Sequence, residues 1–234
     1  MKYNLIAYLT VAVGVIVMLF QTVAERHMEM PAFFENDKNI TTVIIDPGHG
    51  GEDGGATGVT GTLEKGINLS ISRKLQAILE FCGEKTVMTR DGDESIHDEG
   101  NSVRGRKVSD IKNRVKLVSK AENPVLLSVH LNFFPQESCR GAQVFYSANN
   151  DASKNLAESV QEMLKAGMND GNNRSAKKAE KSIYLLNHVE CPAVLTECGF
   201  LSNYSEEALL VTEEYQTKLA MCIAAGYLQF ISME

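Results

Sequence analysis

The sequence lacks the features that mark several common classes of protein. Its 234 residues include five cysteines, but none form a CxxC pair and their spacing is irregular, so neither a disulfide framework nor a cysteine-based zinc site is indicated. It also lacks an excess of basic residues. The formal net charge of -7 argues against nucleic acid as the main partner, because phosphate backbones call for clustered Lys and Arg. No internal repeat or low-complexity tract is present, which excludes an array of repeated binding modules.

The N-terminal segment differs in character from the rest of the chain. Lys2 precedes an uncharged apolar run from Leu5 to Phe20, and this arrangement predicts an export signal over residues 1–24. The length of the run suits either a cleaved signal peptide or a signal anchor, and both alternatives stay open. Residues 25–39 are polar and are predicted to form a tether. We therefore expect the remainder, residues 40–232, to fold outside the cytoplasm, secreted or membrane-anchored.

Short apolar runs alternate with segments of helical periodicity through residues 40–232. This alternation predicts a single α/β domain with a mostly parallel central sheet flanked by helices on both faces. The predicted strands are residues 41–46, 85–89, 123–130, 141–147 and 192–200, and the predicted helices are residues 63–82, 109–121, 153–168 and 212–231. A long loop is predicted for residues 91–107, because glycine and charges of both signs dominate there.

Each of three predicted strands ends at, or is closely followed by, a residue whose side chain can bind a metal or transfer a proton. His49 follows the first strand in "DPGHGG", His130 closes "PVLLSVH", and Glu197 closes "AVLTE". The carboxyl ends of parallel strands meet at one edge of a sheet, where ligands bind. One histidine at such a place is more often packed or solvated, but two imidazoles and a carboxylate are the ligands that a catalytic zinc ion uses.

Sequence spacing does not decide which carboxylate completes that set. Asp46, Glu52, Asp53, Glu64 and Glu197 all compete for the role. Glu52 and Asp53 lie among glycines, which favours a solvated turn, and Glu64 begins a helix, where an acidic side chain is favourable without any ligand. Asp46 precedes proline and is predicted to hold the turn or a histidine ring behind the ligands. The glycine-rich stretch lacks the Gly-Lys-Ser/Thr ending of a phosphate-binding loop, and its acidic residues would repel phosphate.

Four blocks in order carry a family resemblance: "IIDPGHGGEDGGA", "LEKGINL", "LLSVHLN" and "PAVLTECGFLSN". Together they resemble the zinc-dependent N-acetylmuramoyl-L-alanine amidases with the type-3 catalytic domain. The resemblance covers Thr41 to Ile231. The size of the chain, the predicted export signal and the lack of a wall-binding module further resemble the germination-specific, spore-cortex branch of that family.

The resemblance implies a function and a role for each site residue. It implies hydrolysis of the amide between N-acetylmuramic acid and L-alanine in peptidoglycan, with Zn²⁺ bound by His49, Glu64 and His130, and Glu197 as the catalytic acid-base residue. Leu131 departs from the alanine that family members often have after the second histidine. An activator or localising protein is an expected partner, as in some relatives. Two alternatives stay open, namely a zinc hydrolase acting on another wall bond and a non-catalytic peptidoglycan-binding protein.

Overall fold

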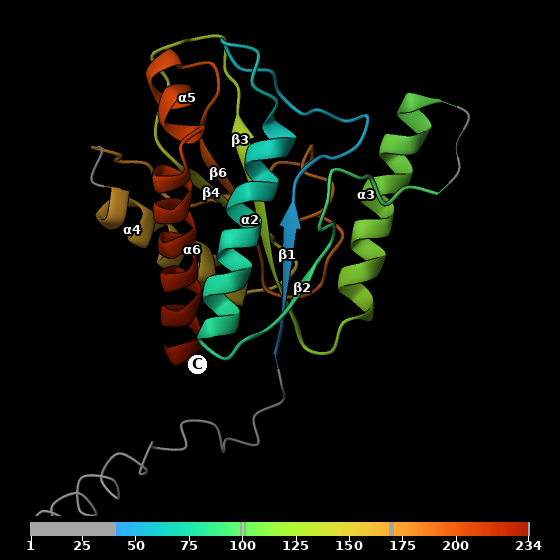
Figure 1. Cartoon of the computed structure of the whole chain (residues 1–234). Helices are drawn as coiled ribbons and strands as arrows, with labels where there is room; N and C mark the ends of the chain where they lie inside the picture. The colour runs from blue at the N-terminus through green and yellow to red at the C-terminus, as the bar shows by residue number, and fades with distance from the viewer. Residues whose placement is uncertain (1–40, 99, 101, 169–170, 234) are drawn as a thin grey trace, which may run out of the picture. The chain divides into compact units, whose positions relative to one another are not determined.

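A six-stranded sheet forms the centre of the described structure (Figure 1). The computed structural model describes residues 41–98, 100, 102–168 and 171–233, which lie within one compact unit, Asn39–Glu234. The predicted export signal and tether lie outside the described residues and stay predictions. Within the described ranges, no helix combines the length and the apolar character that crossing a membrane requires.

Neighbouring strands of the sheet pair in parallel except β4 and β6, so β4 and β5 run opposite to the other four strands. Its order is β2-β1-β3-β6-β4-β5, and β4 pairs antiparallel with β6. The predicted α/β fold with a mostly parallel sheet is therefore confirmed. The strands are β1 (Thr42–Pro47), β2 (Lys85–Met88), β3 (Pro124–Asn132), β4 (Gln143–Tyr146), β5 (Lys177–Lys178) and β6 (Ala193–Phe200).

The central strands are apolar because both of their faces are covered, as parallel sheets require. All six residues of β1 are buried, and so are most of those in β3 and β6. One face packs on α2 (Glu64–Phe81), α4 (Ala152–Met168) and α6 (Glu213–Met233), with α6 in contact with both other helices (Figure 1). The opposite face packs on α3 (Val103–Lys120) and on residues 179–191. The short helix α5 (Tyr204–Leu210) follows β6.

Helix α3 begins six residues before the predicted start at Ser109, so the loop predicted for residues 91–107 ends too late. The Oγ of Ser102 caps the helix by accepting from Gly105 N at 3.1 Å. The first turns are largely exposed and show no apolar period, which is why periodicity did not reveal them. The earlier start places Arg106 and Lys107 on a helix beside the loop that follows β1.

An irregularity in β6 changes which side chains share a face of the sheet. His130 of β3 is the partner of Glu197, but Asn132 is the partner of Phe200, so β6 carries one extra residue between the two pairs. His130 and Asn132 lie on one face because side chains alternate along a strand. Glu197 and Phe200 consequently lie on that same face, the one covered by α3.

Candidate metal centre

The loop after β1 turns sharply and passes close to β3. His49 has φ 63° and Gly50 has φ 135°, backbone conformations that most side chains disfavour. Gly48 lies against the ring of His130, where an added Cβ would be 2.2 Å from Cε1. A glycine at position 48 is therefore required for the two histidines to approach one another.

Two buried arginines hold the backbone of this loop. Arg114 of α3 donates to the carbonyl oxygens of Pro47 at 2.8 Å and His49 at 2.7 Å. Arg90 donates to those of Pro47 at 3.0 Å and Gly48 at 2.9 Å. These bonds to three consecutive carbonyl groups offset the cost of the left-handed conformation at His49.

Asp46 supports the loop through Arg114. Its carboxylate accepts from Arg114 Nη1 at 2.6 Å, from Thr89 Oγ1 at 2.7 Å and from Ser128 Oγ at 2.7 Å. Burial raises the pKa of Asp46, but the charge of Arg114 and the two hydroxyl donors outweigh burial and lower that pKa to about 2. Asp46 thus contacts the arginine that holds the turn, and none of its hydrogen bonds reaches a histidine ring.

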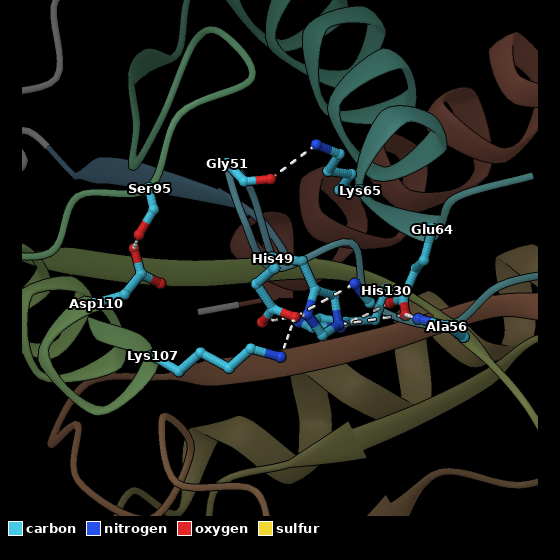
Figure 2. Close-up of polar contacts among 12 residues, drawn as sticks. His49, Gly51, Ala56, Glu64, Lys65, Ser95, Lys107, Asp110 and His130 are labelled. Atoms are coloured by element: carbon cyan, nitrogen blue, oxygen red, sulfur yellow. Dashed lines mark hydrogen bonds and ion pairs between the residues drawn. The ribbon is translucent and has the colours of Figure 1, made fainter. Parts of the chain in front are cut away.

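The ring of His49 lies between two carboxylates. Nδ1 lies 2.8 Å from Asp53 Oδ2, and Nε2 lies 3.2 Å from Glu64 Oε2. Lys107 Nζ contacts the other oxygen of Asp53 at 2.7 Å, and Figure 2 shows the Lys107 side chain extending from α3 toward His49. Burial lowers the pKa of His49, but the hydrogen bonds with both carboxylates outweigh burial and raise that pKa to about 9. Asp53 fixes the orientation of the ring and leaves Nε2 directed at Glu64.

Glu64 is the first residue of α2, yet its side chain is only 4% exposed and is not a solvated charge at the helix end. Oε2 accepts from Ala56 N at 2.8 Å, and Oε1 accepts from Leu131 N at 3.0 Å. Oε1 also lies 3.0 Å from His130 Nδ1. Burial raises the pKa of Glu64, but the contacts with both histidines prevail and hold that pKa well below its usual range.

His49, Glu64 and His130 converge on one point (Figure 2). One ligand atom from each lies within 4.8 Å of the others, and the histidine rings meet edge to face with centroids 5.0 Å apart. Two imidazole nitrogens and one carboxylate oxygen gathered in this way are the donor types that a catalytic zinc ion takes from a protein. The residues present therefore fit a zinc ion.

Glu197 lies next to this cluster on the neighbouring strand, as the register partner of His130. Its Oε2 is buried and has no hydrogen-bond partner among the described residues. Burial raises the pKa of Glu197 to about 7, and a carboxyl group with that pKa can both accept and give a proton near neutrality. An unpaired buried carboxyl oxygen is costly, which makes Glu197 a candidate for a functional role.

The structure thus brings together all four residues that the resemblance singled out. Of the other competing carboxylates, Glu52 pairs with Arg106 on the exposed side of α3. Asp53, expected in a solvated turn, instead contacts the ring of His49. The sequence carried no signal for the contribution of Arg114, because its loop contacts span 65 to 68 residues of chain.

The fold and this cluster define a class, an α/β protein with the ligand set of a catalytic metal centre beside a buried glutamate. The family model described as N-acetylmuramoyl-L-alanine amidase matches residues 43–229. The chain belongs to this family.

Individual relatives agree with the assignment. The chain is 37% identical over 191 residues to the germination-specific N-acetylmuramoyl-L-alanine amidase of Bacillus subtilis, covering 81% of this chain and 79% of that one. The CwlD amidase of Clostridioides difficile, solved in complex with the GerS lipoprotein, is 40% identical, with a TM-score of 0.79 over 82% of this chain and 99% of that one. The catalytic domain of CwlV from Bacillus (Paenibacillus) polymyxa is 28% identical, with a TM-score of 0.71 over 83% and 99%.

Proposed function

We propose that this chain is a zinc-dependent amidase that cleaves the bond between N-acetylmuramic acid and L-alanine in peptidoglycan. The observation that carries the proposal is the convergence of His49, Glu64 and His130 beside the buried, unpartnered oxygen of Glu197. Two imidazoles and one carboxylate are the protein ligands of many catalytic zinc sites, which keep a further position open. Membership of the amidase family supports the identity of the bond.

The reaction needs an activated water molecule and a protonated leaving group. Zn²⁺ held by His49, Glu64 and His130 would supply a Lewis acid that polarises the amide carbonyl and makes water more acidic. Glu197 takes a proton from the attacking water and gives it to the amine nitrogen as the carbon–nitrogen bond breaks. The products are a muramic acid carboxylate and a peptide with a free amino terminus.

Mass spectrometry of digested peptidoglycan tests this proposal. We expect the purified protein to release intact stem peptides and to contain zinc by elemental analysis. Glu197→Gln is expected to keep the zinc and to lose roughly a hundredfold or more in rate, as for loss of a general acid-base group. Loss of acetate or trimming within the stem would indicate another wall hydrolase, and binding without turnover would indicate a non-catalytic protein. Wild-type rates in Glu197→Gln would contradict its assigned role.

We propose further that the protein acts outside the cytoplasm on spore cortex. The uncharged apolar run after Lys2 supports export. The 37% identity to a germination-specific amidase supports the cortex as substrate. A comparison of rates on purified cortex and on vegetative wall tests this point, and equal rates on both would count against a cortex preference.

An activator or localising protein is also part of the proposal. The related CwlD amidase was solved in complex with a lipoprotein, which supports a partner for this chain as well. We expect the purified protein alone to be less active on intact wall than the protein in a lysate of its source cells. Equal activity at equal concentration would contradict the need for a partner.

A further inference from the structure

A hollow lies at the same edge of the sheet as the metal centre, near the start of β4. It has a volume of about 620 Å³ and is lined by residues of two loops, at positions 136, 138–141 and 171–174. Arg140 and Arg174 are the charged residues among the described residues that line it, and none of those is acidic. We call this hollow the Arg174 pocket. Its charge favours an anionic ligand.

The strand pairing relates this pocket to Glu197. Gln143, the first residue of β4, is the antiparallel partner of Glu197. Directly opposed residues in such a pair have side chains on the same face, with Cβ atoms about 4.5–5.5 Å apart. Gln143 Oε1 accepts from Arg174 Nη1 at 3.2 Å. One side chain therefore separates the guanidinium of Arg174 from the strand position that carries Glu197.

A second contact places Arg174 on the same face independently. Its guanidinium carbon lies 4.8 Å from the centroid of the Phe200 ring, a favourable cation–π distance. The extra residue in β6 brings Phe200 onto the face that carries Glu197. Without that extra residue, strand alternation would direct Phe200 and the arginine above it to the opposite side of the sheet.

The contacts that hold Arg174 in place among the described residues include no carboxylate. Nε donates to the carbonyl oxygen of Arg140 at 3.1 Å, and the backbone N–H of Arg174 donates to Asn172 Oδ1 at 3.0 Å. The described partners of its side chain are neutral oxygens and an aromatic ring. A guanidinium fixed in this way loses little conformational freedom when it binds a carboxylate through paired hydrogen bonds.

We propose that the Arg174 pocket binds a carboxylate of the stem peptide, and this inference rests on the proposed amidase function. In the proposed substrate the N-acetylated sugars are neutral, whereas the stem peptide carries free carboxylates. The pocket therefore receives the peptide side of the scissile bond. The substrate then lies with its peptide toward β4 and its glycan toward β1.

Two synthetic substrates test the pocket, a muramoyl peptide with free carboxyl groups and the same molecule with those groups converted to carboxamides. We expect Arg174→Gln to raise KM for the free acid by about tenfold or more and to change kcat by less than about twofold. For the carboxamide, KM should be the same in wild type and variant. Arg174→Lys keeps the positive charge but not the paired hydrogen-bond donors. Its KM for the free acid should therefore lie between those of the wild type and Arg174→Gln. Lys154→Gln, which removes one positive charge from α4 on the opposite face, should match wild type on both substrates.

Equal increases in KM for both substrates, or no increase for either, would overturn the proposal. If wild-type protein released no peptide from either substrate, the amidase function would fail separately. Equilibrium binding of the free stem peptide would then show whether the Arg174 pocket binds a carboxylate. Binding that weakens on amidation and in Arg174→Gln supports it, and binding that changes in neither case overturns it.

Discussion

The two faces of the sheet differ in what they bury. The face toward α2, α4 and α6 is an apolar core, built from side chains such as Leu164 and Ile223. The face toward α3 has a smaller apolar cluster, and at its edge it carries Asp46, His130 and Glu197. The same strands supply both, because alternate residues point to opposite sides. The candidate metal centre lies at the edge where the two faces meet, because Glu64 belongs to α2 on the three-helix face whereas His130 and Glu197 lie on the α3 face.

The physical basis of order also differs between the faces. Removal of apolar area from water stabilises the three-helix face, at about 25 cal/mol per Å². On the α3 face, buried charges are compensated by one another, with Arg114 between Asp46 and Asp110. Substitutions in the three-helix core should therefore lower the free energy of unfolding. On the α3 face, substitution of a proposed ligand or of a group that contacts one should change metal binding and rate, and substitution within the Asp46–Arg114 ion pair should change stability in a pH-dependent way.

The largest effect is expected from His49→Ala, which removes a proposed ligand. Loss of a group that only supports a ligand costs about 10–100-fold in metal affinity, so loss of the ligand itself should cost more than about a hundredfold. Elemental analysis and wall-digestion rates measure this effect. The far-ultraviolet circular dichroism spectrum should stay that of the wild type. A variant that retained stoichiometric zinc would remove His49 from the ligand set.

Leu164→Ala on α4 tests the contribution of the three-helix face to stability. Its side chain is fully buried in the three-helix core, and such truncations cost about 2–5 kcal/mol of unfolding free energy. Denaturant unfolding measures that loss. Zinc affinity of the folded variant should equal that of wild type. A coupled loss of zinc affinity would show that the two faces are not independent.

We expect acid to lower the free energy of unfolding by protonating Asp46 on the α3 face. Its pKa is about 2 in the fold against an ordinary 3.8, so the folded state favours the ionised form. That stabilisation is present above pH 3.8 and is lost as the pH falls toward 2, and it amounts to about 2 kcal/mol at 1.36 kcal/mol per pKa unit. Urea unfolding of wild type and Asp46→Asn between pH 5 and pH 2 measures it. The stability difference between them should shrink by that amount, and a constant difference would contradict the role of this carboxylate.

Of the four substitutions predicted here, Asp53→Asn should have the smallest effect. The amide keeps the shape of the side chain but weakens the support of the His49 ring, which we expect to lower zinc affinity by about tenfold, the lower limit for such groups. Asp53 is partly exposed and already shared with Lys107. Competition with a chromogenic chelator measures the affinity. Glu52→Gln, a neighbouring substitution outside the cluster, provides the matched control and should leave the affinity unchanged.

Apolar patterning predicted most of the fold. The runs that became β1, β3 and β6 are apolar because they are buried on both sides, and this property is visible in sequence. The first turns of α3 were missed because their side chains face solvent and lack a period. The two-residue strand β5 was also missed, because it consists of exposed lysines without any apolar pattern.

The candidate site was predictable only in part, for a different reason. His49, His130 and Glu197 follow from strand ends, but Glu64 had an adequate explanation as a helix-end charge, and only the family resemblance raised it. The contact of Asp53 with His49 depends on the left-handed turn between them, which a residue other than glycine rarely adopts. Spacing along the chain cannot predict such a turn.

The order of the strands has a consequence for the assembly of the protein. β6 comes late in the chain but lies in the middle of the sheet, between β3 and β4. His49, Glu64 and His130 belong to the first part of the chain and can meet once β1, α2 and β3 have docked. Glu197 comes from β6, which fills the position between β3 and β4. A chain that ended before β6 would contain the three proposed ligands, but it would lack Glu197 and the strand on which β4 pairs.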